Sequence, residues 1–359
     1  MAGSMGELVR RTLVVLLLVG IALVVPILST TLMLIFGAIL VAILIRSAAW
    51  PYMRLGLGNA PSVLLGLVTI LLLLGGFGWL FGAQLSGQFG ELQAQLTAAV
   101  PELRARLSTL PVVGSLAGQT PDIQQIAGRA LGFAFGLLGL VTNLVLVIVG
   151  AAYLALEPDV YKRGLARLFP KGRAEKIIEA LEVSGHALKR YLLGQLLTMA
   201  IVGGMVWIGL ELIGVPSAAA LGLTIGIANF IPLVGPFIGA IPGLVIAFSA
   251  VPDMFLYALL VYVVAQQLEG NVLTPMVQNM AVSIPPALLI FALAALGSLF
   301  GFIGVILAAP LTVVIYTLVT MLWTRDTLGH DVKVPGGKRR REHQADEDAS
   351  VPTCEQQPG

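Results

Sequence analysis

Positive charge is missing from most of the second half of this chain. No Lys or Arg occurs in the 134 residues from Tyr191 to Thr324, and the only acids there are Glu211, Asp253 and Glu269. A water-soluble fold of this size exposes charged side chains, so the absence indicates that lipid surrounds the segment. An ionisable residue in such a segment costs free energy and therefore points to a function.

Cysteine and histidine are scarce as well. The single cysteine, Cys354, lies in a polar tail, which excludes an intrachain disulfide and a cysteine metal cluster. The three histidines show no zinc spacing, and the sequence has no phosphate-binding glycine loop or nucleophile elbow. We therefore expect no metal, no cofactor and no enzymatic activity. A net charge of +2 gives no reason to expect a nucleic-acid partner.

Apolar residues dominate what is present. The chain is 57% hydrophobic and 11% charged, against about 25% charged residues in soluble domains. Continuous apolar runs, rather than short alternating segments, predict an all-α polytopic membrane protein and exclude a β-barrel. The runs cover residues 12–28, 30–45, 61–83, 130–155, 191–213, 216–231, 235–251, 254–270, 283–300 and 301–323. The first two, separated only by Ser29 and Thr30, predict a tight helical hairpin.

Basic residues predict the orientation. Cations flank the first two runs, eight lie in 157–190, and Arg325 and the 338–341 cluster follow the last run. The positive-inside bias places all of these, and both termini, in the cytoplasm. An even number of full crossings must then separate Arg190 from Arg325, although five runs lie between them. Some runs are therefore broken or re-entrant, and six to eight true crossings are compatible with the sequence.

Two amphipathic regions interrupt the apolar runs. The balanced charge of the 84–129 region suits the extracytoplasmic side. Within it, residues 85–110 carry an apolar stripe at helical spacing, interrupted by Pro101, which predicts two helices that lie on the membrane surface or on the bundle, or an oligomer contact. The basic 157–190 region is expected in the cytoplasm, and residues 171–192 predict an interfacial helix that leads into the next span. We expect a membrane domain at 1–325 and a disordered cytoplasmic tail at 326–359.

The first candidate functional segment is rich in proline and glycine. Three prolines within eleven residues do not fit one regular helix, and such broken helices form the binding sites of secondary transporters. Glycines at four-residue intervals offer a smooth face for close helix contact, although a plain tight turn with packing glycines is the alternative. The hinge or broken-helix candidates here are Pro232, Gly235, Pro236, Gly239 and Pro242, with Asn229 as a binding candidate.

The second candidate segment surrounds Glu269. A carboxylate beside amides can bind a cation or take up a proton during a transport cycle. The alternative is a solvated acid at a helix end, with Gly270 terminating the helix. The binding candidates are Glu269, Gln266, Gln267 and Asn271, and the hinge candidates are Gly270 and Pro275.

These segments resemble the autoinducer-2 exporter family of bacterial membrane proteins. The matching residues are Pro232-x-x-Gly235-Pro236-x-x-Gly239-x-x-Pro242, Gln267-x-Glu269-Gly270-Asn271-x-x-x-Pro275, and the basic segment that ends at Gln195. The resemblance implies an inner-membrane permease of about eight nominal helices that forms a homo-oligomer. Some members of the family are linked to signal export and others to sodium or lithium/proton exchange.

The sequence therefore predicts a secondary transporter of the bacterial inner membrane. An ion gradient would drive its export of a small polar molecule, such as a quorum-sensing signal. Monovalent cation/proton antiport is the alternative within this class, and a membrane scaffold that moves nothing is the alternative from another class. We expect the two candidate segments to meet near the midplane of the bilayer. Glu269 would carry the proton or cation, the amides would supply hydrogen bonds, and backbone carbonyls near Pro232 and Gly235 would add ligands.

Overall fold

Helices form almost all of the described structure. The computed structural model describes residues 2–76, 141–250, 252–280 and 284–325, with isolated positions at 79, 87, 88, 90, 91 and 94. No strand occurs among these residues, and five of their helical segments are long and apolar enough to cross a membrane. The expected all-α polytopic fold is confirmed. The tail at 326–359 and nearly all of the 84–129 region lie outside the described residues.

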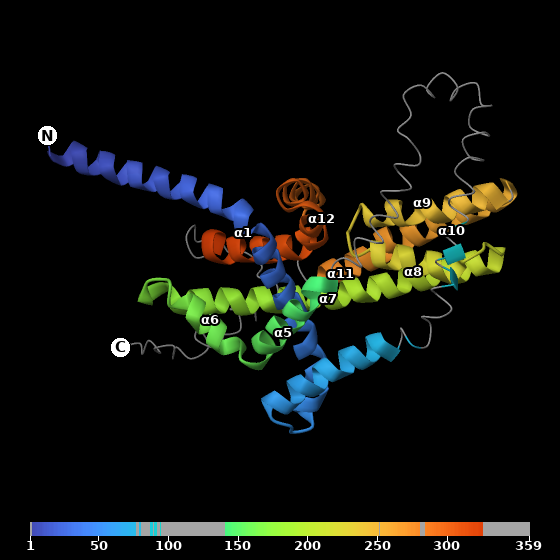
Figure 1. Cartoon of the computed structure of the whole chain (residues 1–359), viewed down its shortest axis with the longest axis horizontal. Coiled ribbons are helices and arrows are strands. Elements are labelled where there is room, and N and C mark those ends of the chain that lie inside the picture. The colour runs from blue at the N-terminus through green and yellow to red at the C-terminus, as the bar shows by residue number, and fades with distance from the viewer. Residues whose placement is uncertain are drawn as a thin grey trace, which may run out of the picture.

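Figure 1 colours the described helices in chain order from the N-terminus to the C-terminus. The described elements are α1 (Ala2–Arg54), the Asn59–Gly76 helix, α5 (Val141–Leu156), α6 (Pro158–Ala166), α7 (Lys171–Ile213), α8 (Ala218–Ala228), α9 (Gly235–Ala250), α10 (Pro252–Leu268), the π-helix η1 (Glu269–Leu273), α11 (Thr274–Met280), α12 (Pro286–Val319) and the π-helix η2 (Thr320–Arg325).

The predicted hairpin between the first two apolar runs is wrong. The backbone of α1 stays helical over 53 residues and passes through Ser29 and Thr30. Both residues keep their backbone N–H and tolerate helical dihedral angles, so a polar pair does not by itself end a helix. The membrane-length part of α1 extends from Thr30 to Arg54.

The second half of α1 packs against α5 and the Asn59–Gly76 helix. Small residues such as Ala38 and Ala42 meet Ala151 and Ala155 in a buried cluster. Arg46 donates a hydrogen bond of 2.7 Å to the carbonyl oxygen of Ala155, in the last turn of α5. The last carbonyls of a helix have no intrahelical partner, so a cationic donor stabilises this end.

The longest described helix after α1 is α7, which has 43 residues. It begins in the basic region and continues without a break into the apolar run. Its expected place at the cytoplasmic membrane surface stays a prediction. Its second half packs with α8, α9 and α10 around a core that includes Val206, Leu221 and Ala247. Figure 1 shows these three helices lying along the same half of α7.

Two chain reversals occur where the sequence has glycine or proline. The turn at 229–234 separates α8 from α9, as the proline pattern predicted. In α12, Gly301 has φ 62° and ψ −145°, outside the helical region. A Cβ at Gly304 would collide with the carbonyl of Leu296, eight residues earlier, which shows that the two arms of α12 fold back on each other. This reversal lies at the boundary between the runs 283–300 and 301–323.

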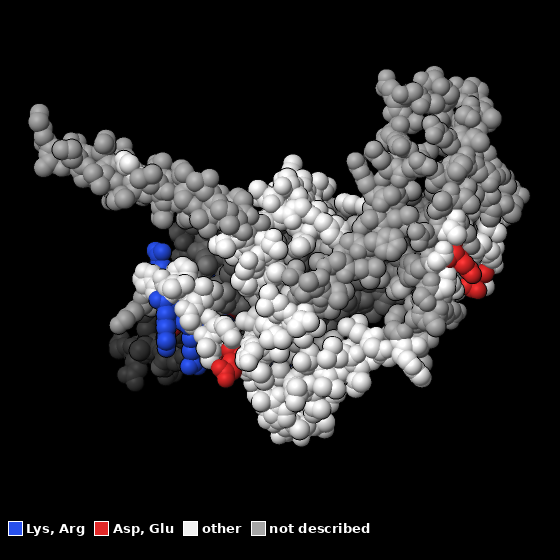
Figure 2. Space-filling model, viewed as in Figure 1, with Lys and Arg blue, Asp and Glu red and all other residues white. Residues whose placement is uncertain are grey.

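Charged side chains gather where α6 and the start of α7 lie, as Figure 2 shows on its visible face. Lys162 on α6 lies 2.7 Å from Asp159 and 2.8 Å from Glu182 of α7. The hydrogen bond from Lys162 holds the pKa of Asp159 below its ordinary value. Arg325, at the end of η2, binds both carboxylate oxygens of Glu179 at 2.8 and 3.0 Å. We call this region, with α6, residues 171–190 and Arg325, the charged end.

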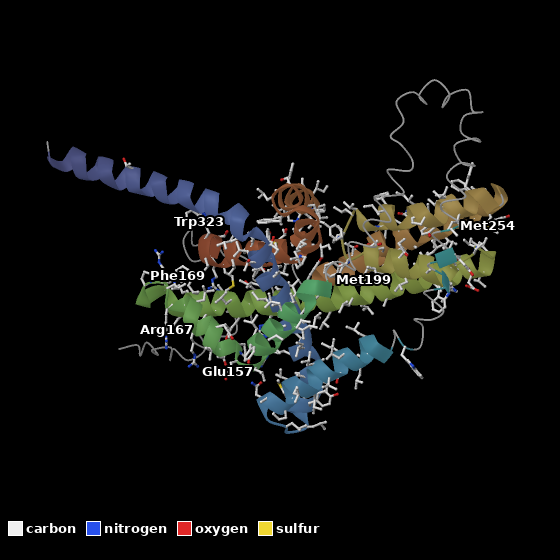
Figure 3. All side chains as sticks on the ribbon, in the orientation of Figure 1. Glu157, Arg167, Phe169, Met199, Met254 and Trp323 are labelled. Atoms are coloured by element: carbon white, nitrogen blue, oxygen red, sulfur yellow. The ribbon has the colours of Figure 1, made fainter. Side chains whose placement is uncertain are left out.

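The opposite end of the bundle holds the start of α10. Figure 3 places Met254 at that end, Met199 partway along α7, and Arg167, Phe169 and Trp323 toward the charged end. The second arm of α12 therefore runs antiparallel to α7.

Candidate functional site

Three buried polar side chains from three separate elements form the candidate site. Gln195 of α7 is 7% exposed, Asn229 at the end of α8 is fully buried, and Glu269 at the start of η1 is 8% exposed. Buried polar groups are normally paired, because an unpaired one costs about 1–3 kcal/mol. A cluster of three in an apolar bundle therefore calls for a functional explanation.

Asn229 is buried because the chain reverses directly after it. Proline at 232 lacks a backbone N–H and cannot extend α8, and Leu233 adopts φ 70° in the turn. A Cβ at Gly235 would collide with the carbonyl oxygen of Ala228, so only glycine allows α9 to start this close to α8. The turn therefore holds Asn229 inside the bundle.

Glu269 is positioned by an irregular stretch of helix. The helix does not end at Gly270, because α10, η1 and α11 form one helical run through residues 252–280. The N–H of Thr274 bonds to the carbonyl oxygen of Glu269, five residues earlier, as in a π-helix. Pro275 follows directly and lacks a donor, which disfavours regular i to i−4 bonding here. Short π-helical stretches are rare and often occur at functional sites.

Hydrogen bonds in the cluster are incomplete. Nε2 of Gln195 donates to the backbone oxygen of Asn229 at 2.6 Å. The side chain of Asn229 lies beside the Glu269 carboxylate. Even so, Nδ2 and Oδ1 of Asn229 and Oε2 of Glu269 are buried without a hydrogen-bond partner. The cluster can therefore accept a proton, a small cation or a polar solute with little loss of existing bonds.

The structure brings together only part of the predicted binding set. Asn229 and Glu269 meet, and Gln266 is half-buried one turn before Glu269. Gln267 and Asn271 are exposed on the outer side of the helix. Gln195 was missed as a site residue, and the available signal was its position as the first amide in the apolar run after Arg190.

The predicted hinge residues mark close contacts as well as breaks. Pro236 lies in the first turn of α9, whereas Pro242 lies inside that helix. Gly239 allows α9 to approach Ile225 of α8, and Gly243 allows it to approach the hydroxyl of Tyr262 on α10. The hairpin of α8 and α9 is thus packed closely between α7 and α10.

The cluster lies between the charged end and the opposite end of the bundle, and its expected place near the bilayer midplane stays a prediction. Glu269 follows the 17 residues of α10, which corresponds to about 25 Å of helix. Gln195 is five residues after Arg190, or about 7.5 Å along α7.

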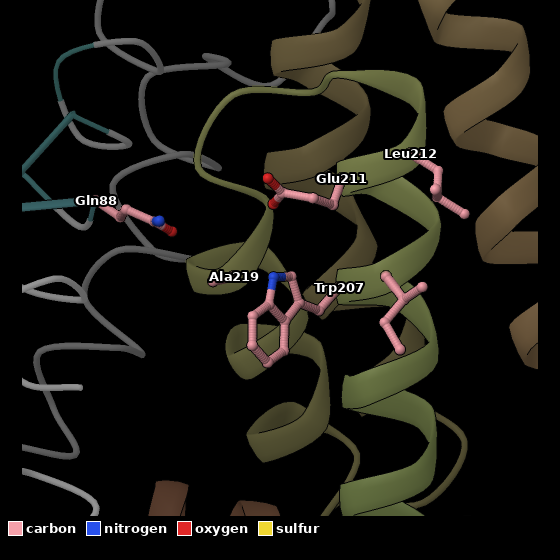
Figure 4. A pocket seen from close by; sticks show the side chains of 6 residues that line it. Gln88, Trp207, Glu211, Leu212 and Ala219 are labelled. Carbon is pink, nitrogen blue, oxygen red and sulfur yellow. The ribbon is translucent and has the colours of Figure 1, made fainter. Parts of the chain in front are cut away.

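A separate hollow lies at the other end of α7 (Figure 4). Its volume is about 370 Å³, and Trp207, Glu211 and Gln88 are among the residues that line it. Oε1 of Gln88 accepts a hydrogen bond of 3.0 Å from the backbone N–H of Ala220, in the first turn of α8. Glu211 is exposed there, so this acid does not resemble Glu269 in its surroundings.

Metal binding by the usual ligands has no support within the described ranges. These residues contain no group of three or more His, Cys, Asp or Glu side chains that could hold a metal ion. Glu269 instead lies beside the amide of Asn229.

Comparison with known proteins identifies relatives of this chain. The model of the AI-2E family transporters matches residues 12–323. YueF of Bacillus subtilis is 32% identical over 55% of this chain and 54% of its own length. YrrI of the same organism is 34% identical over 45% of this chain and 46% of its own length. Both are named as candidate transport proteins.

A third relative, PerM of Escherichia coli, is named as a candidate permease and is 26% identical over 53% of this chain and 54% of its own length. The chain thus spans about half the length of these relatives in the aligned regions.

Proposed function

The chain belongs to the AI-2E transporter family, and from that premise we propose that it is a secondary transporter of the bacterial inner membrane. In this proposal an ion gradient drives export of a small polar molecule, such as a quorum-sensing signal. One observation carries it: Glu269 is the only buried charged residue among those that the structure describes, and one of its carboxylate oxygens lacks a partner.

Glu269 binds the coupling proton or cation in this mechanism. An acid inside a membrane bundle is costly unless its charge is compensated, so uptake of a cation or proton offsets the cost. Asn229 supplies an amide beside the carboxylate, and Gln195 fixes the backbone of Asn229 through its hydrogen bond. Gln266, three residues before Glu269, is half-buried and is the next amide that could contact a bound solute. Gln267 and Asn271 are exposed at the outer surface.

Monovalent cation/proton antiport is the second candidate. One carboxylate and two amides suffice to exchange a proton for a small cation, and this small buried set favours that possibility. A scaffold without transport gives no reason for three unpaired polar atoms at Asn229 and Glu269. We further propose a homo-oligomer with both termini and the charged end in the cytoplasm, following the positive-inside bias.

Reconstitution tests the proposal. Purified protein in proteoliposomes, under an imposed proton or sodium gradient, should move one or more members of a panel of small polar solutes and monovalent cations. The variant Glu269→Gln should lose gradient-driven flux, whereas the matched variant Glu211→Gln, at an exposed acid, should retain it. Equal flux by Glu269→Gln and the parent protein would contradict the role of Glu269, and absence of any flux would favour the scaffold.

A further inference from the structure

One side of α7 carries polar residues from the charged end up to the candidate site. Ser184, Tyr191, Gln195 and Thr198 follow one another at spacings of seven, four and three residues. At about 100° per residue, all four lie within about 60° around the helix axis. Ser184, Gln195 and Thr198 are buried residues, and the hydroxyl oxygen of Tyr191 is buried too. The stripe therefore faces the interior of the bundle.

Two hydroxyls in this stripe are unsatisfied. Oγ of Ser184 and Oη of Tyr191 are buried without a hydrogen-bond partner. A helical Ser or Thr can satisfy itself by bonding to the carbonyl four residues earlier, as Thr198 does with Gly194. Ser184 does not do so. Since each unsatisfied buried hydroxyl costs about 1–3 kcal/mol, a water molecule or a polar solute that bonds to these two groups would be stabilised there.

Around Tyr191 the stripe faces the second arm of α12. Leu188 and Leu192 pack with Leu307 in one buried cluster. Ala187 packs with Val313 in the next cluster, which Tyr191 also contacts. Because the second arm of α12 runs antiparallel to α7, these contacts form a row along the two helices that leads toward the charged end. We call this contact region the α7–α12 seam.

Both ends of the seam are defined by polar contacts. At the inner end, Gln195 bonds to Asn229, which lies beside Glu269. The turn after Asn229 touches α12 as well, because Ile231 packs with Leu293 and Ala308. At the outer end, Arg325 holds Glu179 through two hydrogen bonds across the two helices. From Ser184 to Gln195 the seam covers about 16 Å of α7.

We propose that the α7–α12 seam is the route by which water and a small, uncharged, hydrogen-bonding solute pass between the Glu269 site and the charged end, with the Glu179–Arg325 ion pair across its outer opening. The proposal rests on the proposed transport function and adds the route. Hydroxyl and amide groups both donate and accept hydrogen bonds, so they replace the hydration of a neutral polar solute. An apolar seam without these groups would reject the same solute.

Cysteine labelling tests the route without any gradient. Cys354 is the single cysteine of the chain, so Cys354→Ser provides a cysteine-free background. In it, Ser184→Cys should react with a membrane-impermeant methanethiosulfonate reagent at least tenfold faster than Val206→Cys, a control at a fully buried position of the same helix. Adding Arg325→Gln should raise the rate further. Equal rates for Ser184→Cys and Val206→Cys in folded protein would overturn the route, and an unchanged rate with Arg325→Gln would overturn the role of the ion pair.

A second measurement covers the case in which Ser184→Cys does not fold. The double variant Ser184→Ala/Tyr191→Phe removes two hydroxyls that have no protein partner, so its melting temperature should stay the same or rise. Its solute flux should fall several-fold. Unchanged flux would contradict the route, while the response of Glu269→Gln separately decides the coupling role. Labelling without any measurable flux would support the route and reject the proposed transport function.

Discussion

Gln195 and Asn229 are 34 positions apart in sequence, and Nε2 of Gln195 donates to the backbone oxygen of Asn229 at 2.6 Å. The bond joins α7 to the turn of the α8–α9 hairpin. It satisfies a carbonyl at the end of α8 that has no partner within its own helix. The bond therefore fixes the backbone of Asn229, whose side chain lies beside Glu269.

Gln195→Leu should destabilise the protein. The substitution leaves the backbone oxygen of Asn229 buried and unpaired, and we expect a loss of about 1–2 kcal/mol in unfolding free energy. Thermal unfolding in detergent measures it. Gln267→Leu changes an exposed amide and should shift stability by less than about 0.5 kcal/mol. Similar effects of the two variants would contradict the importance of this hydrogen bond.

Gly243→Ala should disturb the contact between α9 and α10. Its Cβ would collide with the hydroxyl of Tyr262, and overpacking of this kind costs about 1–3 kcal/mol. Tyr262→Phe removes a buried hydroxyl without a partner, so alone it should be neutral or slightly stabilising. The double variant should recover part of the loss.

A double-mutant cycle of unfolding free energies measures this coupling. Gly204→Ala is the control, because a Cβ there meets no atom within 4 Å, and it should stabilise the helix by up to about 1 kcal/mol. Additive effects of Gly243→Ala and Tyr262→Phe would show that the hydroxyl is not the obstacle.

Gly301→Ala should weaken the reversal in α12. The dihedral angles φ 62° and ψ −145° are unfavourable for a residue with a Cβ, and a strained residue of this kind costs about 1–3 kcal/mol. The melting temperature should fall in this variant and remain unchanged or rise in Gly185→Ala, whose site in α7 is open. A melting temperature equal to that of the parent protein would mean that the two arms tolerate another geometry.

Arg46→Met should loosen the end of α5. It removes a donor to the carbonyl oxygen of Ala155 at 2.7 Å, and charged hydrogen bonds contribute about 1.5–3 kcal/mol. Chemical unfolding should therefore occur at lower denaturant concentration. Arg173→Met, at an exposed position of α7, serves as the control. If both variants unfold at the same denaturant concentration as the parent protein, Arg46 does not stabilise the contact between α1 and the end of α5.

Proline and glycine predicted the reversals of the chain because their effect is local. Pro232 lacks a donor and Gly235 permits an approach that no other residue allows, so the turn at 229–234 follows from residues in it and directly after it. Ser29 and Thr30 gave the opposite outcome, since neither residue prevents helical hydrogen bonding and α1 continues through both.

The composition of the candidate site depended on tertiary contacts and was predicted only in part. Gln267 and Asn271 are neighbours of Glu269 in sequence, but helical geometry turns them to the outside. Gln195 is far from Glu269 in sequence and joins it because α7, α8 and α10 pack together. No pattern within a single segment contains that information.

The unbroken length of α7 makes it a lever. It comes close to α8 at Gly203, where a Cβ would lie 2.9 Å from the carbonyl oxygen of Gly222, and this contact can serve as a pivot. Lys171 is about 48 Å from that point and Gln195 about 12 Å. A tilt of about 5° therefore moves the start of α7 by about 4 Å but Gln195 by about 1 Å. Large displacements at the water-exposed surface are thereby reduced to movements comparable to the making or breaking of one hydrogen bond.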